Sequence, residues 1–341
     1  MTNDETYAGL QPVRWGILGA ANIAVKKVVP AMQRGRLADV VAIASRDGAK
    51  ARAAADALGI SRAYGSYEEL LADPDVDAIY NPLPNHLHVP WSVRAAAAGK
   101  HVLCEKPIAL SAAEARELLA ARDRYGVQVG EAFMVRTHPQ WRVVHELIAA
   151  GRIGELRLME GHFSYHNRDP QNVRNRAEWG GGGLMDIGCY PVTIARWLFG
   201  AEPREVVSTI DRDPDFGVDR LTSGLLRFDA GQATFSCSTQ LVSWQRVQIF
   251  GTRGRIEVRI PFNAPPDRST YVFVDDGSTL GGDGDAIEIP AVDQYTLQGD
   301  QFSAAVRGVG TVPGTMEDAV ANMAVLDALF RSAETGRWER P

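Results

Sequence analysis

Two short segments of the chain carry the side chains best suited to acid–base chemistry. The first is Glu105-Lys106-Pro107, which follows an apolar run beginning at His101. Because proline donates no hydrogen bond to a strand partner, the strand predicted here ends at or before Lys106 and leaves Glu105 and Lys106 at its carboxyl end. Ligands of open parallel sheets bind at that edge. Taken alone, the tripeptide also fits a solvated charge pair in a loop.

The second segment is the run of four glycines from Gly180 to Gly183 and the helix predicted to begin near Leu184. Asp186 and Tyr190 are four residues apart, so both project from one face of this helix. A phenol, whose usual pKa is about 10, can act as an acid or base when a nearby ammonium group lowers that value. The alternative is an aspartate favoured by the helix dipole and a tyrosine packed in the core.

A nucleotide-binding turn is predicted after the first strand, residues 13–18. The sequence Gly19-Ala20-Ala21-Asn22-Ile23-Ala24 follows it and matches the dinucleotide fingerprint, with alanine at the second and third glycine places. Such a turn presents the N–H groups of a helix start to a pyrophosphate. The candidate cofactor-binding residues here are Gly19, Ala20, Ala21, Asn22 and Ile23.

The second predicted strand, residues 39–44, ends in Ser45-Arg46 instead of an acidic residue. An acid there would accept the ribose hydroxyls of NAD, whereas serine and arginine suit the 2′-phosphate of NADP. NADP is therefore the preferred cofactor, with NAD possible, and Lys50 could assist. The alternative is that Arg46 and Lys50 only solvate the start of the helix predicted over 49–58.

The β–α alternation continues through a strand at 76–80 and a loop over 81–88 that contains two prolines. This loop lies at the same edge of the sheet as Lys106. Leu83, Asn85, His88, Glu105 and Lys106 complete the set of candidate cofactor-binding residues. Asn85 could equally cap the helix predicted over 89–98.

Beyond residue 150 the pattern changes to strands separated by short turns. Strands are expected at 156–164, 204–210, 219–228, 233–239, 244–250 and 254–260, as an antiparallel meander, and two closing helices at about 298–308 and 316–335. Residues 265–290 are expected to be a loop-heavy edge. The predicted fold is an α/β Rossmann domain over 1–134 and an α+β domain over 135–341 with a large, mostly antiparallel sheet. Its open face predicts a homodimer or homotetramer formed through that sheet.

Composition narrows the class of protein. The 341 residues are 45% hydrophobic and 23% charged, with a net charge of −6 and no basic run, which argues against nucleic-acid or anionic-membrane partners. Cys104, Cys189 and Cys237 are far apart and lack metal-ligand spacing, so buried reduced thiols in a cytoplasmic protein and no metal site are expected. Residues 1–12 are polar, without an export signal, and are expected to be a disordered tail.

Together these motifs resemble the Gfo/Idh/MocA oxidoreductases, in order and spacing, over nearly the whole chain from Val13 to Gly336. The resemblance is strongest to the branch that contains glucose–fructose oxidoreductase, D-xylose dehydrogenase and dimeric dihydrodiol dehydrogenase. It implies that Lys106 and Tyr190 are the catalytic pair and that Asp186 is the acid that binds the sugar. The inositol-dehydrogenase branch has histidine where Tyr190 stands.

The implied reaction is hydride transfer between a nicotinamide cofactor and a hydroxyl-bearing carbon of a pyranose, an aldose or sugar acid. Tyr190 would take the hydroxyl proton, and Lys106 would bind the substrate oxygen. Two polar runs, residues 165–168 and 174–176, could bind the sugar, and Trp179 could stack on its ring. The candidate substrate-binding residues are Lys106, His166, Arg168, Arg176, Trp179, Asp186 and Tyr190.

Two other functions use the same fold. A nicotinamide-dependent glycoside hydrolase returns the hydride within each turnover, so it would release free sugar without accumulating reduced cofactor. A non-catalytic dinucleotide-binding regulator would be expected to lose Lys106 or Tyr190, and both residues are present. The sequence does not name the sugar, the carbon oxidised or the physiological direction.

Overall fold

The computed structural model describes residues 7–278 and 281–341, which form two compact units. Unit 1 comprises residues up to 137 together with 293–320, and unit 2 comprises 138–292 together with 321–341. The predicted boundary after residue 134 is close to residue 137, where the chain first passes from unit 1 to unit 2. The assignment of everything from 135 onward to a second domain is corrected, because 293–320 returns to unit 1. The first six residues of the expected tail lie outside the described part.

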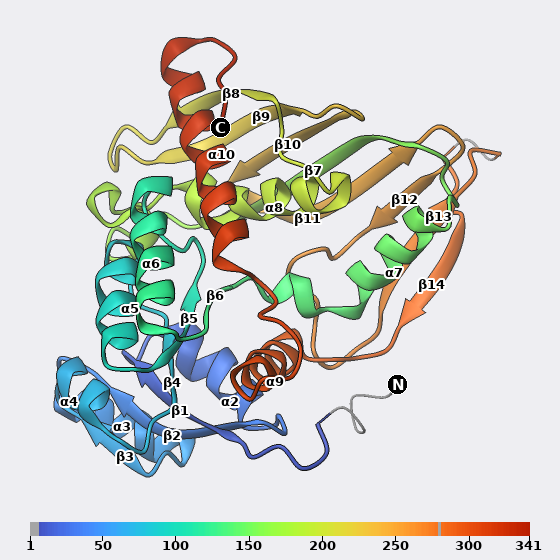
Figure 1. Ribbon diagram of the computed structural model, residues 1–341. Coiled ribbons are helices and arrows are strands. Elements are labelled where there is room, and N and C mark those ends of the chain that lie inside the picture. Colours follow the sequence, from blue (N-terminus) through green and yellow to red (C-terminus); the bar gives the residue numbers. More distant parts are fainter. Residues whose placement is uncertain (1–6, 279–280) are drawn as a thin grey trace. The chain divides into compact units, whose positions relative to one another are not determined.

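Unit 1 is built on a six-stranded parallel sheet in the order β3-β2-β1-β4-β5-β6 (Figure 1). Ile17, Ile43 and Ile79 are fully buried, as expected of strands covered on both faces. The strand order reverses between β1 and β4, which is where Rossmann-like folds bind ligands. This confirms the predicted fold class. The strands are β1 (Val13–Leu18), β2 (Ala38–Ala44), β3 (Arg62–Tyr64), β4 (Ala78–Asn81), β5 (His101–Glu105) and β6 (Val129–Ala132).

Local signals explain where the longer helices of unit 1 begin and end. The side chains of Asp47 and Ser111 accept backbone N–H groups at the starts of α3 and α6, and both helices end at a left-handed glycine, Gly59 or Gly126. The helical elements are η1 (Ala24–Val28), α2 (Val29–Met32), α3 (Gly48–Leu58), α4 (Tyr67–Ala72), η2 (Asn85–Leu87), α5 (His88–Ala97), α6 (Ala112–Tyr125), η3 (Met134–Thr137), α9 (Gln294–Val306) and the first turns of α10 (Met316–Thr335).

Helix α9 belongs to unit 1 for a specific packing reason. The ring of Phe302 lies 5.3 Å from that of Trp15 in β1, and Trp15 donates its indole N–H to Ser303 over 3.1 Å. Oδ1 of Asp300 accepts the backbone N–H groups of Arg36 and Leu37, both at 2.8 Å. These contacts join positions almost three hundred residues apart, so no local pattern in the sequence could have shown them.

Unit 2 contains an eight-stranded sheet in the order β14-β13-β12-β11-β7-β10-β9-β8. Neighbouring strands of this sheet are antiparallel, except for β7 and β10, which run parallel. β7 lies between β11 and β10. The expected simple meander is corrected by this insertion, while a mostly antiparallel sheet is confirmed. The strands are β7 (Leu156–His166), β8 (Glu205–Arg212), β9 (Asp219–Arg227), β10 (Gln232–Ser238), β11 (Gln240–Gly251), β12 (Arg255–Val258), β13 (Thr270–Asp275) and β14 (Asp285–Ile289).

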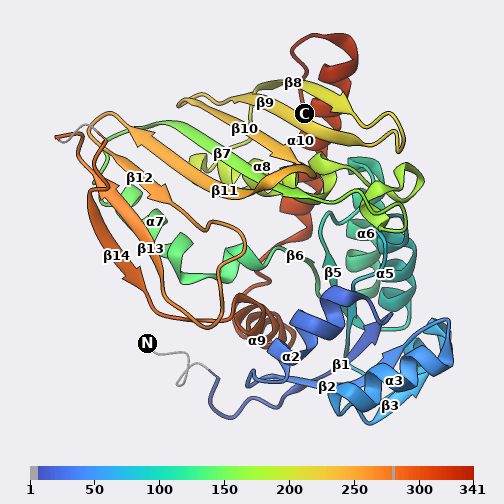
Figure 2. The same cartoon turned by 180° about the vertical axis from the view of Figure 1, so that it is seen from behind.

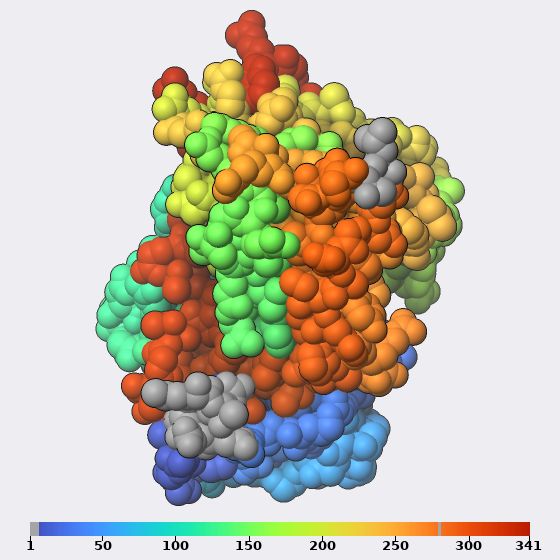
Figure 3. Space-filling model, turned by 90° about the vertical axis from the view of Figure 1, so that its right-hand side faces the viewer, coloured from blue at the N-terminus to red at the C-terminus, as the bar shows by residue number. Residues whose placement is uncertain are grey.

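The segment expected to be a loop-heavy edge, residues 265–290, contains the last two strands of this sheet. Val272 is fully buried, and Val274 and Ile289 are nearly so. These residues give the two strands an apolar face, which the many Asp and Gly residues of the segment did not suggest. β13 also packs against helix α7 (Pro139–Ala149), seen as neighbouring orange and green regions in Figure 3.

One face of the second sheet is covered and the other is open. Helix α8 (Cys189–Phe199) packs on β7 and β10, and Figure 2 shows the opposite face with none of the unit's described helices over it. The remaining helical elements of unit 2 are η4 (Val173–Asn175), η5 (Ala177–Trp179), η6 (Leu184–Gly188) and the rest of α10. No helix in the described ranges is long and apolar enough to cross a bilayer. Cys104, Cys189 and Cys237 are buried thiols, as predicted.

Candidate active site

The fingerprint turn follows β1 at the carboxyl edge of the parallel sheet. Gly19 has a φ of +92°, in the left-handed region that favours glycine. A Cβ at this position would lie 3.0 Å from Cδ2 of Leu83, so glycine lets the loop after β4 come close to the turn. Ala20, Ala21, Asn22 and Ile23 lead from the turn into the helical residues of η1, whose N-terminal N–H groups suit a phosphate.

The end of β2 presents the side chains expected at a 2′-phosphate. Ser45 is buried and its hydroxyl accepts the N–H of Asp47 over 3.2 Å, while Asp47 caps α3. Arg46 and Lys50 are exposed, and the Arg46 guanidinium is close enough to Tyr67 to act on its hydroxyl electrostatically. Burial raises the pKa of Tyr67, and Arg46 opposes that shift. The guanidinium thus interacts with a tyrosine from α4 that the sequence motif did not indicate.

His88 has a structural role. It is fully buried, and its ring nitrogens lie 2.8 Å from the carbonyl oxygen of Pro107 and 2.7 Å from that of Leu83. Burial lowers the pKa of His88 to about 4. Both ring nitrogens are occupied by backbone, so the expected contact with the cofactor is corrected: His88 ties the loop after β4 to the loop after β5. Asn85, in η2 beside it, is half-buried.

Lys106 follows β5 between two anchored neighbours. Tyr80 donates its hydroxyl to Oε1 of Glu105 over 2.6 Å, and Glu131 accepts the N–H of Ile108 over 2.8 Å. The Lys106 side chain is half-buried. Because both sides of Lys106 are held by buried partners, its backbone has a defined position at the carboxyl edge, as the sequence predicted.

Asp186 and Tyr190 lie on η6 and the first turn of α8, as expected. Tyr190 is only 5% exposed, and its ring packs against Phe163 at 5.7 Å and Phe262 at 5.4 Å. Asp186 is 8% exposed. The phenol ring is therefore fixed by aromatic contacts that do not depend on its hydroxyl group.

Two donors from other elements converge on Asp186. Tyr165, at the end of β7, donates its hydroxyl to Oδ2 over 2.5 Å, and Nε of Arg174 in η4 lies 2.8 Å from the same oxygen. Burial and the carboxylate raise the pKa of Tyr165, and the carboxylate raises the pKa of Arg174. The sequence placed both residues only within polar runs and could not pair them with Asp186.

The glycine run is required by close packing around Asp219. A Cβ at Gly182, whose φ is +114°, would lie 1.9 Å from Oδ1 of Asp219. Oδ2 of Asp219 accepts the N–H of Leu184 over 2.5 Å and the hydroxyl of Thr222 over 3.1 Å. Asp219 therefore holds the start of the helix that carries Asp186. Burial raises the pKa of Asp219 to about 6.

This raised pKa predicts a pH dependence of stability. The folded state binds the Asp219 proton more tightly than the unfolded state, so the contribution to stability is fully present below about pH 4 and lost as pH rises through about 6. A shift of roughly 2 units corresponds to about 3 kcal/mol. Asp219→Asn should remove this loss. The free energy of unfolding in urea should therefore fall between pH 4.5 and 7 for the wild type relative to Asp219→Asn.

The matched control for this prediction is Asp267→Asn, which changes an exposed carboxylate. Its stability difference from the wild type should not vary with pH over the same range. A constant difference between the wild type and Asp219→Asn would show that Asp219 does not titrate as stated.

The other expected sugar-binding residues surround the same strand end. His166 and Arg168 are exposed, and the Arg168 guanidinium pairs with Asp215 at 2.6 Å and Asp213 at 3.3 Å. A hydrogen bond from Asn175 to the carbonyl of Asp169 ties this segment to η4. The segment that carries His166 and Arg168 is thus tied to η4, and the Arg168 side chain is directed to the β8–β9 turn.

Trp179 ends η5 immediately before the glycine run. Its ring is half-buried, and the Arg176 guanidinium lies 5.5 Å from the ring centroid. Arg176 also lies 3.8 Å from Glu178. Stacking of a sugar on Trp179, and binding by Arg176, remain predictions.

The chain matches two family models that together cover most of its length. Residues 13–133 match the oxidoreductase family with an NAD-binding Rossmann fold, and residues 141–257 match the Gfo/Idh/MocA C-terminal domain. These two ranges correspond to the parallel sheet of unit 1 and to most of the large sheet of unit 2.

Similar proteins extend over the full chain. An uncharacterized oxidoreductase of Rhizobium meliloti is 50% identical over 96% of this chain and 98% of its own. D-xylose 1-dehydrogenase (NADP(+)) 2 of Haloferax volcanii is 40% identical over 94% of this chain and 98% of its own. The crystal structure of KijD10, a 3-ketoreductase from Actinomadura kijaniata in complex with NADP and TDP-benzene, superposes with a TM-score of 0.88 at 30% identity, covering 94% of this chain and 98% of that one. The protein is a member of the Gfo/Idh/MocA family of oxidoreductases.

Proposed function

We propose that this protein is an NADP-preferring sugar oxidoreductase that transfers a hydride between the nicotinamide and a hydroxyl-bearing carbon of a pyranose or pyranose derivative. The observation that carries the proposal is that one helical stretch carries the buried phenol of Tyr190, whose ring is fixed by aromatic contacts, and the carboxylate of Asp186 four residues before it. Oxidation of a sugar hydroxyl needs a proton acceptor, and a carboxylate can accept a hydrogen bond from a neighbouring hydroxyl of the same sugar. Relatives named for xylose and for a dTDP-linked dideoxyglucose support a sugar substrate.

The residues of unit 1 fit NADP. Gly19 has the positive φ that a tight phosphate-binding turn needs, and the end of β2 offers Ser45 and the guanidinium of Arg46 where an acid would repel a 2′-phosphate. When bound, the cofactor supplies the hydride acceptor or donor. The NADP named with the xylose dehydrogenase and with the ketoreductase structure supports this preference.

The chain's own groups handle the proton and the substrate oxygen. Tyr190 takes the proton of the hydroxyl that is oxidised, and Lys106 donates a hydrogen bond to the same oxygen and stabilises the tyrosinate. Asp186 accepts a hydrogen bond from a neighbouring sugar hydroxyl. In the reductive direction Tyr190 returns its proton to the carbonyl oxygen. Glu105, held by Tyr80, fixes the backbone from which Lys106 projects.

A screen of substrates tests the function. Aldoses, sugar acids and nucleotide-linked sugars are incubated with the protein and NADP or NAD, and absorbance of the reduced cofactor is followed. Sustained accumulation of NADPH with at least one pyranose is expected. Release of free sugar from glycosides without accumulation of reduced cofactor would indicate a hydrolase instead.

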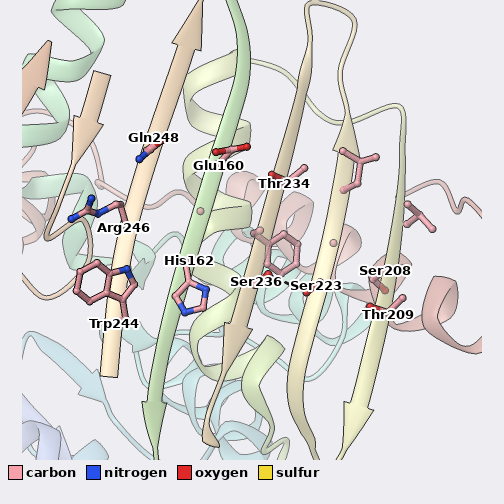
Figure 4. Close-up of a pocket in the computed structure, with 15 residues that line it drawn as sticks. Glu160, His162, Ser208, Thr209, Ser223, Thr234, Ser236, Trp244, Arg246 and Gln248 are labelled. Carbon is pink, nitrogen blue, oxygen red and sulfur yellow. Dashed lines mark hydrogen bonds between the residues drawn. The ribbon is translucent and has the colours of Figure 1, made fainter. Parts of the chain in front are cut away.

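We also propose that a second copy of the chain covers the open face of the large sheet. Figure 4 shows polar and aromatic side chains from β7 to β11 around a hollow on that face, among them Glu160, His162, Trp244 and Arg246. At one end of β11, Val242 is 80% exposed and Trp244 is 54% exposed. Large apolar groups beside mixed polar groups are typical of subunit interfaces.

This assembly predicts a homodimer or homotetramer by light scattering at micromolar protein. Trp244→Glu should shift the mass toward the monomer, because it replaces a large apolar contact with a carboxylate that is costly to remove from water. Trp338→Glu, at another exposed tryptophan, is the matched control and should leave the mass unchanged. A monomeric wild type would contradict the assembly.

The three buried cysteine thiols support a cytoplasmic location.

A further inference from the structure

Asp186 is held by two side chains that no sequence motif assigns to it. Tyr165 and Arg174 both contact Oδ2, at 2.5 and 2.8 Å, and they come from different elements, the end of β7 and η4. We propose that Arg174 and Tyr165 are positioning residues that keep Asp186 ionised and oriented as the acceptor of a substrate hydroxyl. The proposal rests on the function proposed above and adds which chemical group the substrate presents to Asp186.

Burial alone would favour the neutral form of this carboxyl group. The Asp186 side chain is 11% exposed, and a carboxylate removed from water needs compensating donors to stay charged. Arg174 supplies a guanidinium that keeps its charge at any working pH, and Tyr165 supplies a hydroxyl donor. Since both donors lie on one oxygen, the pair also restricts rotation of the carboxylate.

The backbone around Arg174 fixes it relative to the helix that carries Asp186. The carbonyl oxygen of Arg174 accepts the N–H of Gly182 over 2.9 Å, and a Cβ at Gly181 would lie 2.4 Å from that same oxygen. Asn172 accepts the N–H of Arg174 over 3.1 Å. The glycine run therefore packs directly on η4, and any shift of Arg174 would shift the start of the helix.

The charge of the Asp186 carboxylate restricts which substrate group can bind to it. An ionised carboxylate is an acceptor only, so the substrate group bound to it must be a donor. A sugar hydroxyl meets this requirement, whereas a carboxylate or a carbonyl oxygen at that position would be rejected. The inferred substrate class is thus a pyranose with a hydroxyl group next to the reacting carbon, and any carboxylate of a sugar acid must lie elsewhere.

Kinetics of Arg174→Gln and Tyr165→Phe test this role. Arg174→Gln should raise KM for the sugar by about 10- to 100-fold, the range of a charged hydrogen bond, with a smaller change in kcat. Tyr165→Phe should give a smaller rise in KM. The dissociation constant for NADP should not change, since its proposed site lies in unit 1. Arg174→Lys should recover part of the loss.

The matched control is Arg220→Gln. Arg220 pairs with Asp211 at the same distance, 2.8 Å, but the aspartate is 52% exposed, so the pair should contribute little. Arg220→Gln should retain the KM of the wild type. If Arg174→Gln keeps the wild-type KM in the same way, the positioning role is wrong.

A stability cycle tests the pair without any substrate. Arg174→Gln leaves a buried carboxylate without its cation and should lower the melting temperature, and adding Asp186→Asn should raise it again because the uncompensated charge is gone. Additive effects of the two substitutions would overturn the proposal. A wild type that oxidises no sugar while the cycle shows coupling would instead overturn the proposed function and leave the Arg174–Asp186 pair standing.

Discussion

Replacing Tyr190 with phenylalanine is expected to lower kcat by about 10²- to 10⁴-fold, the usual effect of removing a positioned acid or base. The fold should survive, because the phenylalanine ring keeps the packing of the Tyr190 ring against Phe163 and Phe262. NADP should bind with unchanged affinity in calorimetry. The matched control is Tyr125→Phe, at an exposed tyrosine ending α6, which should keep full activity.

Lys106→Ala should reduce kcat by a similar factor, and the double variant with Tyr190→Phe should be little worse than either single variant. Groups that act on the same proton are not additive, because removing one already abolishes the step that the other assists. Multiplied losses would mean that the two residues act independently. A folded Tyr190→Phe that keeps most of its activity would refute the assignment of the catalytic pair, although cofactor binding by unit 1 would still stand.

The second large effect concerns the cofactor. Arg46→Ala should weaken NADP binding by about 10- to 100-fold, which corresponds to roughly 1.5–3 kcal/mol for a charged hydrogen bond, and should leave NAD binding almost unchanged. The change removes the exposed guanidinium that follows the end of β2. Calorimetric titration of both cofactors measures it.

The control for this prediction is Arg52→Ala, at another exposed arginine in α3. It should leave both dissociation constants near those of the wild type, so that loss of charge from the helix alone is separated from loss of Arg46. Equal affinities of the wild type for NADP and NAD would contradict the preference.

Much of unit 1 could be predicted from the sequence because its signals are local. Asp47 and Ser111 cap helices, Gly59 and Gly126 end them, and the runs at 13–18 and 101–105 form strands whose apolar side chains are buried. The position of Lys106 follows from Pro107 in the same way. A three-residue strand such as β3 is too short to produce a pattern and was not predicted.

The features that sequence reasoning missed depend on long-range contacts. Helix α9 joins unit 1 through Trp15 and Asp300, and β7 enters the middle of the second sheet between strands that follow it by many residues. β13 and β14 form in a segment whose glycines and aspartates suggested a loop.

Residue types and their spacing predicted which side chains form the site, and the structure added the partners that these side chains contact. Asp186 and Tyr190 are on one helix, so their spacing was informative. Tyr165 and Arg174 reach Asp186 from other elements, and the buried environment of His88 arises from two loops, so neither was visible from spacing. What a side chain contacts across elements is set by the fold, whereas its position on its own element is set by its neighbours in sequence.

The central claim is hydride transfer from a sugar carbon to NADP, and isotope transfer tests it most directly. The best sugar from the substrate screen is prepared with deuterium on its ring carbons and incubated with the protein and NADP, and the reduced cofactor is analysed by mass spectrometry. The proposed function predicts one deuterium in each NADPH formed, and almost no NADPH when Tyr190→Phe replaces the wild type over the same time. NADPH that forms without deuterium, or sugar that is consumed with no reduced cofactor, would contradict it.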